Sequence, residues 1–240
     1  MRFDTFPDYL GYEIIPVIWD CWPRYVENMA KWFHKHKVQT AFFTSSQTAE
    51  RMRSLCPNVN INHLPEAIET ELYHAGKPLS ERSIDYLEFG RCSRILDSTQ
   101  FDKSINVLSS RNERTGLKTR AQLADALADS KITLALTRLD NQPELAEGVD
   151  TLTQRYWECM LSGVVILGRA PQELIDIIGY DPVVHLDKDN ANDQILGILE
   201  HIEDYQELVD RNRQRALEHG DWKVRIEWMM GVMKKQGYEV

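Results

Sequence analysis

Short apolar runs alternate with amphipathic segments along this chain, and that alternation limits the fold more than any other feature. In the first part, apolar runs cover residues 14–19, 40–45 and 59–64, and helical patterns cover residues 24–36 and 46–55. The order strand, helix, strand, helix, strand is typical of a parallel sheet covered by helices. We therefore expect an α/β protein.

The same alternation returns after residue 83. Strands are predicted at residues 84–89, 104–108, 132–137, 164–167 and 183–186, and helices at residues 120–129, 171–178, 192–202, 205–218 and 222–234. In the last helix the predicted apolar contacts are Trp222, Ile226, Met229 and Met230. The simplest architecture is two doubly wound, Rossmann-like lobes with a ligand at the carboxyl ends of the strands.

A charged segment with little periodicity separates the two halves and suggests the domain boundaries. We expect a reduced N-terminal lobe, a linker, a second lobe and a final helix that crosses back onto the first lobe. Their predicted ranges are residues 1–70, 71–82, 83–219 and 220–240.

Composition and charge exclude several classes of protein. A hydrophobic content of 42% is ordinary for a globular chain, and a net charge of −9 argues against a protein that coats nucleic acid. The four cysteines have no disulfide or metal-site spacing, so we expect reduced thiols in a cytoplasmic protein. No apolar run approaches the roughly 20 residues of a membrane-spanning helix.

Residues 150–163 carry the strongest candidate site. Thr151 and Gln154 have the spacing of a capping box, which predicts a helix that begins just after Thr151. The N–H groups of its first turn would attract an anion. Arg155 and Glu158 lie three residues apart, so both can face the same cleft. Such a surface suits a phosphate and a sugar hydroxyl.

The same segment resembles a known family. Asp150, a seven-residue spacer, Glu158 and Gly163 before an apolar strand resemble the Glu-x7-Glu signature of retaining group 1 glycosyltransferases with the GT-B fold. Arg155, three residues before the Glu, resembles the spore-coat-maturation-like branch of that family. Other similar segments are His63-Leu-Pro-Glu-Ala-Ile-Glu69, Leu87-Glu-Phe-Gly-Arg91 and Gly168-Arg-Ala-Pro171-Gln-Glu-Leu174. The similarity covers roughly residues 60–230.

The sequence departs from the family pattern at several places. Asp150 stands where most members have Glu, and Ala67 replaces the usual Gly. The segment before residue 83 is shorter than the family's acceptor lobe. We therefore expect a fragment, a half-enzyme that needs a partner, or a reduced binding module.

The resemblance implies transfer of a sugar from a nucleotide-sugar, with retention of configuration and without a metal ion or other cofactor. Fixed cations and a helix N-terminus would stabilise the charge on the leaving diphosphate. Asp150 and Arg155 would be catalytic. The residues expected to bind the donor nucleotide are Arg91, Arg94, Thr137, Arg138, Thr151 and Glu158.

Plainer explanations exist for each residue. Arg155 and Glu158 can form an ordinary ion pair on a solvated helix face, and Asp150 can simply begin a helix. Arg91 and Arg94 can be surface residues of a turn, and Thr137 and Arg138 can be plain strand-end residues.

Two functional hypotheses follow. One is a glycosyltransferase that acts on a glycan or lipid-linked acceptor in glycan or polysaccharide assembly, and the other is a non-catalytic nucleotide-sugar-binding module or subunit. The sequence has neither a dinucleotide fingerprint nor a phosphate-binding P-loop to support an unrelated nucleotide-binding fold. Expected partners are the donor, the acceptor, and a second copy or subunit, but no nucleic acid. The expected location is cytoplasmic, with peripheral binding to the inner face of the membrane as an alternative.

Overall fold

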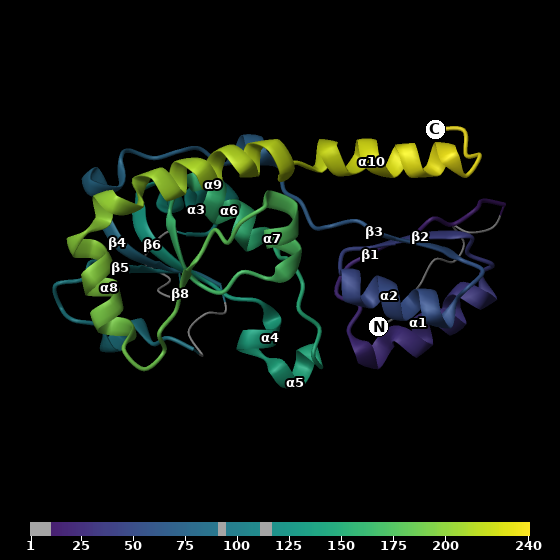
Figure 1. The fold of residues 1–240 in the computed structure, drawn as a ribbon, viewed down its shortest axis with the longest axis horizontal. Coiled ribbons are helices and arrows are strands. Elements are labelled where there is room, and N and C mark those ends of the chain that lie inside the picture. The colour runs from purple at the N-terminus through teal and green to yellow at the C-terminus, as the bar shows by residue number, and fades with distance from the viewer. Residues whose placement is uncertain (1–10, 91–94, 111–116) are drawn as a thin grey trace.

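The computed structural model describes residues 11–90, 95–110 and 117–240 and contains two parallel sheets, one in each lobe (Figure 1). The N-terminal sheet has the order β1-β2-β3, with β1 (Val17–Ile18), β2 (Thr40–Phe43) and β3 (Asn60–His63). The second sheet has the order β5-β4-β6-β7-β8, with β4 (Ile84–Glu88), β5 (Val107–Ser109), β6 (Ser130–Ala135), β7 (Val165–Gly168) and β8 (Val184–His185). The predicted α/β class and the two Rossmann-like lobes are confirmed.

Helices connect the strands close to the predicted positions. They are α1 (Pro23–Lys35), α2 (Ser46–Leu55), α3 (Arg120–Ala128), α4 (Arg138–Asn141), α5 (Pro143–Ala146), α6 (Gln154–Ser162), α7 (Gln172–Ile178), α8 (Ala191–Glu200), α9 (Gln206–His219) and α10 (Trp222–Lys235). Thr119 caps α3 through a capping box with Gln122, as its sequence position predicts. The strand expected at residues 104–108 instead spans Val107–Ser109, because its register is set by pairing with β4.

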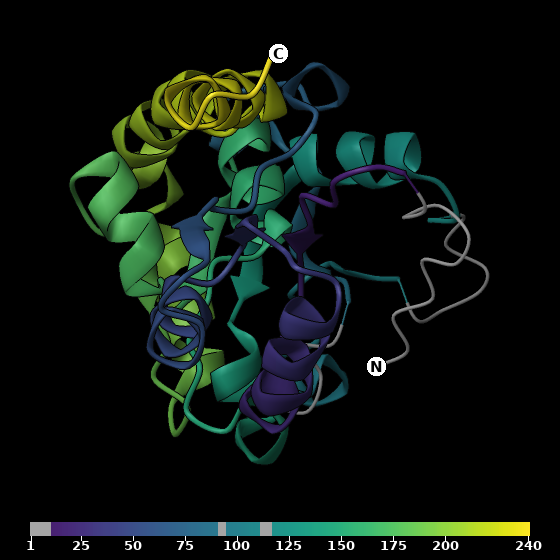
Figure 2. The ribbon, with the colours of Figure 1, turned by 90° about the vertical axis from the view of Figure 1, so that its right-hand side faces the viewer.

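Both faces of the N-terminal sheet are covered (Figure 2). Alternation along β2 turns Ala41 and Phe43 toward the buried faces of α1 and α2, where Phe43 packs against Phe33. Phe42 is turned the other way and meets Trp228 of α10, with ring centroids 6.1 Å apart. The C-terminal helix therefore covers the face of the sheet opposite α1 and α2.

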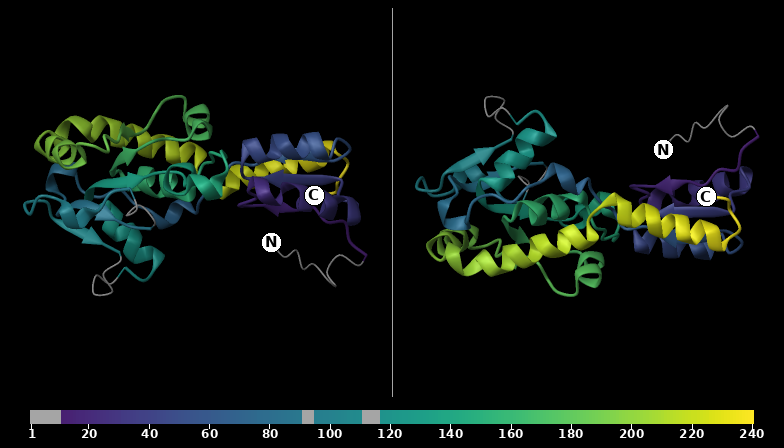
Figure 3. Two further views of the ribbon diagram at one scale, coloured as in Figure 1. Left: turned by 90° about the horizontal axis from the view of Figure 1, so that it is seen from below. Right: turned by 90° about the horizontal axis from the view of Figure 1, so that it is seen from above.

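The chain reaches that position by leaving the second lobe after α9 and crossing back, as Figure 3 shows from two sides. At the crossing, the N–H of Ile68 donates to the carbonyl of Gly220 at 2.8 Å, and the N–H of Trp222 donates to the carbonyl of Ile68 at 3.2 Å. The expected apolar contact by Ile226 is wrong, since this side chain is 49% exposed. Its place toward the protein is taken by Arg225, which is 8% exposed and donates to the carbonyl of Pro65.

The second sheet has a hydrophobic core on each face. Consecutive residues of β4, Tyr86 and Leu87, belong to different buried clusters, one packed by α8 and α9 and the other by α3, α6 and α7. The strand order reverses direction between β4 and β6. In open α/β sheets, ligands bind outside the carboxyl ends of the strands at such a switch point.

The segment expected to be a linker is packed against the second lobe. Tyr73 and Leu79 are buried, and short 3-10 turns cover Thr70–Leu72 and Leu79–Glu81. Arg82 is 4% exposed because its guanidinium donates to the carbonyls of Lys77 and Ser130. Across the described ranges, no helix is both long and apolar enough to cross a membrane.

Candidate functional site

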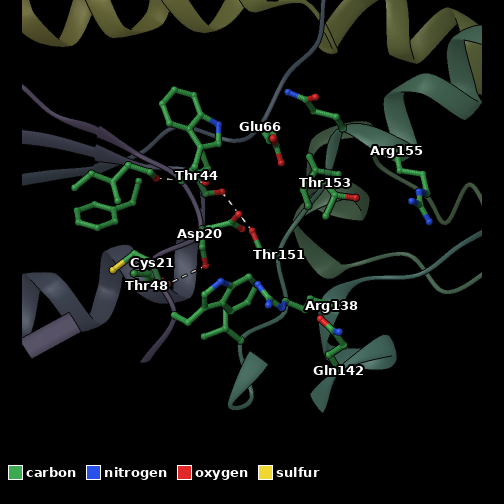
Figure 4. A pocket seen from close by; sticks show the side chains of 18 of the residues that line it. Asp20, Cys21, Thr44, Thr48, Glu66, Arg138, Gln142, Thr151, Thr153 and Arg155 are labelled. Carbon is green, nitrogen blue, oxygen red and sulfur yellow. Dashed lines mark hydrogen bonds between the residues drawn. The ribbon is translucent and has the colours of Figure 1, made fainter. Parts of the chain in front are cut away.

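A cavity of about 350 Å³ lies between the two lobes at the carboxyl ends of their strands (Figure 4). The loops that follow β1 and β2 form one wall, which includes Trp19, Asp20, Trp22 and Thr44. The opposite wall comes from the segment after β6 and from the start of α6. It includes Arg138, Asn141, Gln142, Thr151, Thr153, Gln154, Arg155 and Glu158, and Glu66 of the inter-lobe segment lines the cavity between the walls.

Glu173, in the first turn of α7, ties the two walls together. Its Oε1 accepts hydrogen bonds from the backbone N–H and the hydroxyl of Ser46 in the first lobe, at 2.7 and 2.6 Å. Its Oε2 accepts from the N–H of Leu152 at 2.7 Å and from the hydroxyl of Thr151 at 3.2 Å. The side chain is 8% exposed. A buried carboxylate with four donors holds the α2 N-terminus against the loop that precedes α6.

Further contacts join the lobes around the cavity. Arg24 of α1 forms an ion pair with Glu147 at 2.5 Å. The N–H of Asp150 donates to the side-chain oxygen of Gln47 at 2.8 Å. The guanidinium of Arg138 lies over the ring of Trp22, 4.6 Å from its centroid. These pairs link one lobe to the other.

The start of α6 differs from the sequence prediction. The helix begins at Gln154 with Thr153 as its N-cap, and no side chain caps it. Thr151 lies two residues before the N-cap, outside the first turn, and its hydroxyl donates to Glu173. Thr151 and Thr153 line the cavity, and the first turn of α6 begins beside them.

Arg155 and Glu158 both line this cavity, as their spacing predicts. The guanidinium of Arg155 lies over the ring of Phe89 at the end of β4, 4.7 Å from its centroid. The carboxylate of Glu158 accepts a hydrogen bond from the hydroxyl of Tyr73 at 2.9 Å. Burial, together with the Glu158 carboxylate, raises the pKa of Tyr73 and keeps it a donor.

Gly90 leaves the space that Arg155 occupies. Its φ is +69°, and a Cβ at this position would collide with Nη2 of Arg155. We expect Gly90→Ala to lower the free energy of unfolding by about 1–2 kcal/mol through left-handed strain. Because the substitution also displaces Arg155, it should weaken the expected nucleotide binding by about tenfold, measured by calorimetry.

Gly179→Ala is the matched control for Gly90→Ala. Gly179 has a φ of +87°, and nothing lies within 4 Å of a Cβ built there. This variant should show a similar loss of stability with unchanged nucleotide affinity. Equal affinities in the two variants would show that the position of Arg155 does not matter for binding.

Asp150 lies in an ion-pair network with Arg169, which follows β7 directly. The guanidinium donates to both oxygens of Asp150, at 2.8 and 2.9 Å, and to Asp140 at 2.8 and 2.9 Å. It also donates to the hydroxyl of Thr137 at 3.0 Å. Burial opposes the ionisation of Asp140, but hydrogen bonds from Arg169 and Thr137 outweigh it and lower the pKa of Asp140.

The structure places only some of the residues predicted for the site at the cavity. Arg138, Thr151, Arg155 and Glu158 line the cavity. Asp150 is not among the lining residues, and Thr137 is fully buried behind the wall, bonded to Asp140 and Arg169. Arg91 and Arg94 lie outside the described residues. The functional roles of all these residues stay predictions.

Sequence reasoning missed Glu173, Arg169 and Glu66 as site residues. Two signals were available: Arg169 follows an apolar strand directly, and Glu173 comes two residues after the helix-initiating Pro171. Both places lie at the carboxyl edge of a parallel sheet. Glu66 carried no such signal, since it belongs to a segment without periodicity.

Several polar atoms of the residues in the second wall are buried without a partner among the described residues. They are Nε of Arg138, Oδ1 of Asn141 and Oε1 of Gln142. Buried polar groups are nearly always hydrogen-bonded, so these atoms are unusual for the interior of a protein.

A solved structure with a similar fold is sucrose-phosphate synthase from Thermosynechococcus elongatus, with a TM-score of 0.60 and 12% sequence identity. The match covers 88% of this chain and 62% of that chain, so this chain spans less than two thirds of the relative's length. At this identity the likeness shows the fold, which is that of a GT-B glycosyltransferase. Among curated proteins, no sequence matches this one.

A family model described as glycosyl transferase-like matches residues 94–231, more than half of the chain. The matched range contains α6, the Arg169 network and one complete wall of the cavity. The chain belongs to the glycosyl transferase-like family.

Proposed function

We propose that the protein transfers a sugar from a nucleotide-sugar donor to a glycan or lipid-linked acceptor, with retention of configuration and without a metal ion. The observation that carries this proposal is the meeting of Arg138, Arg155, Glu158 and the first turn of α6 on one wall of the inter-lobe cavity. Family membership makes a transferase the expected chemistry for such a wall.

In this proposal the second lobe binds the donor. The N–H groups at the start of α6 and the guanidinium of Arg155 would stabilise the charge that develops on the leaving diphosphate. Glu158 would accept hydrogen bonds from the ribose hydroxyls, and Arg138 and Thr151 would contact the nucleotide from the same wall. Arg91 and Arg94 complete the proposed set from the sequence.

The proposed role of Asp150 carries a requirement. Both of its oxygens accept hydrogen bonds from Arg169. To contact a donor sugar, Asp150 must therefore give up one of these two hydrogen bonds. This engagement favours the alternative proposal, a non-catalytic nucleotide-sugar-binding module or subunit derived from such an enzyme.

Release of nucleotide from UDP-, GDP- and ADP-sugars, followed by NMR without added metal, distinguishes the two proposals. An enzyme releases nucleotide faster than the protein-free control and gives a product with the donor's anomeric configuration. A binding module retains the nucleotide-sugar unchanged. Inversion of the anomeric centre would contradict the retaining mechanism, and neither binding nor release would contradict both proposals.

A further inference from the structure

We propose that Glu66 contacts the acceptor in the inter-lobe cavity and that the group it binds is an uncharged hydroxyl. This inference rests on the proposed transfer reaction and adds to it the residue and the acceptor chemistry of the first wall.

The backbone around Glu66 is held by both α6 and α10. The indole N–H of Trp157, a fully buried residue of α6, donates to the Glu66 carbonyl at 2.8 Å. Nε of Arg225 on α10 donates to the carbonyl of Pro65 at 3.0 Å. The side chain of Glu66 points into the cavity, toward the space between Asp20 and Thr153 (Figure 4). Its place is therefore fixed by the fold.

The carboxyl of Glu66 differs from that of Glu173. Glu173 accepts four hydrogen bonds, whereas within the described ranges no group donates to the Glu66 carboxyl. A half-buried carboxyl without a donor is unfavourable for the fold. A ligand hydroxyl in the cavity would supply the missing hydrogen bond.

The electrostatics of Glu66 suit a neutral ligand group. Burial, followed by repulsion from Asp20, Glu158 and Glu173, raises the pKa of Glu66 to about 7. Near neutral pH the carboxyl therefore both accepts and donates hydrogen bonds, as a hydroxyl partner requires.

Charge is separated across the cavity. The lining residues of the first lobe include Asp20 but no Lys, Arg or His, and the two lining arginines, Arg138 and Arg155, lie on the second wall. An anionic group on the acceptor would meet Asp20 and Glu66, whereas the anionic diphosphate faces the arginines. Trp19, 41% exposed on the same wall, adds an aromatic surface against which a sugar ring can pack. The first wall thus favours an uncharged, hydroxyl-bearing acceptor.

Stability should reveal the unfavourable environment of Glu66. The folded pKa lies above the ordinary value of 4.5, so the carboxyl's contribution to stability is full below pH 4.5 and is lost as the pH rises through 7. Glu66→Gln should melt with the wild-type protein at pH 4 and at a higher temperature at pH 8. The charged groups that act on this comparison are Asp20, Glu158, Glu173 and the lining arginines.

Transfer is then measured with UDP-, GDP- and ADP-glucose as donors and with neutral saccharides and their phosphate monoesters as acceptors. The wild-type protein should prefer the neutral acceptors. Glu66→Ala should lower kcat/KM for them by about tenfold or more, as loss of a hydrogen bond to a charged group does, with nucleotide affinity within about twofold of wild type. Glu66→Gln, which keeps the shape but removes the charge, should reduce the discrimination against phosphorylated acceptors.

The outcomes distinguish a failure of the proposed function from a failure of the role proposed for Glu66. Absence of nucleotide release by the wild-type protein overturns the proposed function and this inference with it. Transfer that is equal in Glu66→Ala and wild type, a preference for phosphorylated acceptors, or no use of any acceptor overturns the inference alone. A lower melting temperature of Glu66→Gln at pH 8 would assign Glu66 a structural role instead.

Discussion

Glu173→Ala is expected to lower the free energy of unfolding by about 3 kcal/mol, measured by chemical denaturation. The substitution removes the acceptor for four hydrogen bonds and leaves the N–H groups of Ser46 and Leu152 without a partner. Because Ser46 and Leu152 belong to different lobes, the change should also loosen the lobes. Small-angle scattering should show an increased radius of gyration.

Asp176→Ala is the matched control for Glu173→Ala. Asp176 lies on the same helix but is exposed, and its carboxylate accepts a hydrogen bond from the side chain of Gln172. Its substitution should change stability by less than about 0.5 kcal/mol. The loss of stability in Glu173→Gln should lie between those of Glu173→Ala and Asp176→Ala, since the amide nitrogen of Gln replaces one of the two acceptor oxygens. If Glu173→Ala were as stable as Asp176→Ala, the hydrogen bonds of Glu173 between the lobes would not contribute to stability.

Arg169→Ala is expected to lower the free energy of unfolding by about 2–3 kcal/mol at pH 7. Its guanidinium is 34% exposed and the carboxylates of Asp140 and Asp150 are 17% and 18% exposed, so solvent reduces the loss below that of a fully buried network. Without the guanidinium, the two carboxylates lose their shared cation.

The pH dependence of the Arg169 effect follows from Asp140. Its pKa is held below the ordinary 3.8, so its contribution to stability is present above pH 3.8 and is lost as the pH falls through the folded pKa. The difference between Arg169→Ala and wild type should therefore shrink under acid conditions. Lys223→Ala removes an ion pair whose side chains are 75% and 80% exposed, and it should leave stability nearly unchanged. A loss at pH 7 no larger than that of Lys223→Ala would contradict the network's role.

Much of the fold could be predicted because local patterns decide it. The apolar runs specify the strands, and caps such as Thr119 specify where helices begin. The face of α10 could not be predicted in this way. Its contacts depend on Phe42, a residue far away in sequence that meets the ring of Trp228, and both Trp228 and Ile226 stay largely exposed, at 46% and 49%.

In the candidate site, too, local features could be predicted from the sequence, whereas features set by tertiary contacts could not. A spacing of three residues brings Arg155 and Glu158 into one cavity, because helix geometry alone places them on neighbouring positions. The cap predicted at Thr151 is wrong because the helix begins later, at Gln154, and the hydroxyl of Thr151 contacts Glu173. The engagement of Asp150 by Arg169 is equally non-local, since the two residues meet only when β7 and the loop before α6 are packed together.

Calorimetric titration with UDP, GDP, ADP and their sugar conjugates, without added metal, tests the central claim most directly. We predict that one nucleotide binds in about the micromolar range. Arg155→Ala and Glu158→Ala should each weaken that binding by about tenfold or more, as loss of a charged hydrogen bond does. Binding that neither substitution weakens, or no binding by the wild-type protein, would contradict a donor site at the start of α6.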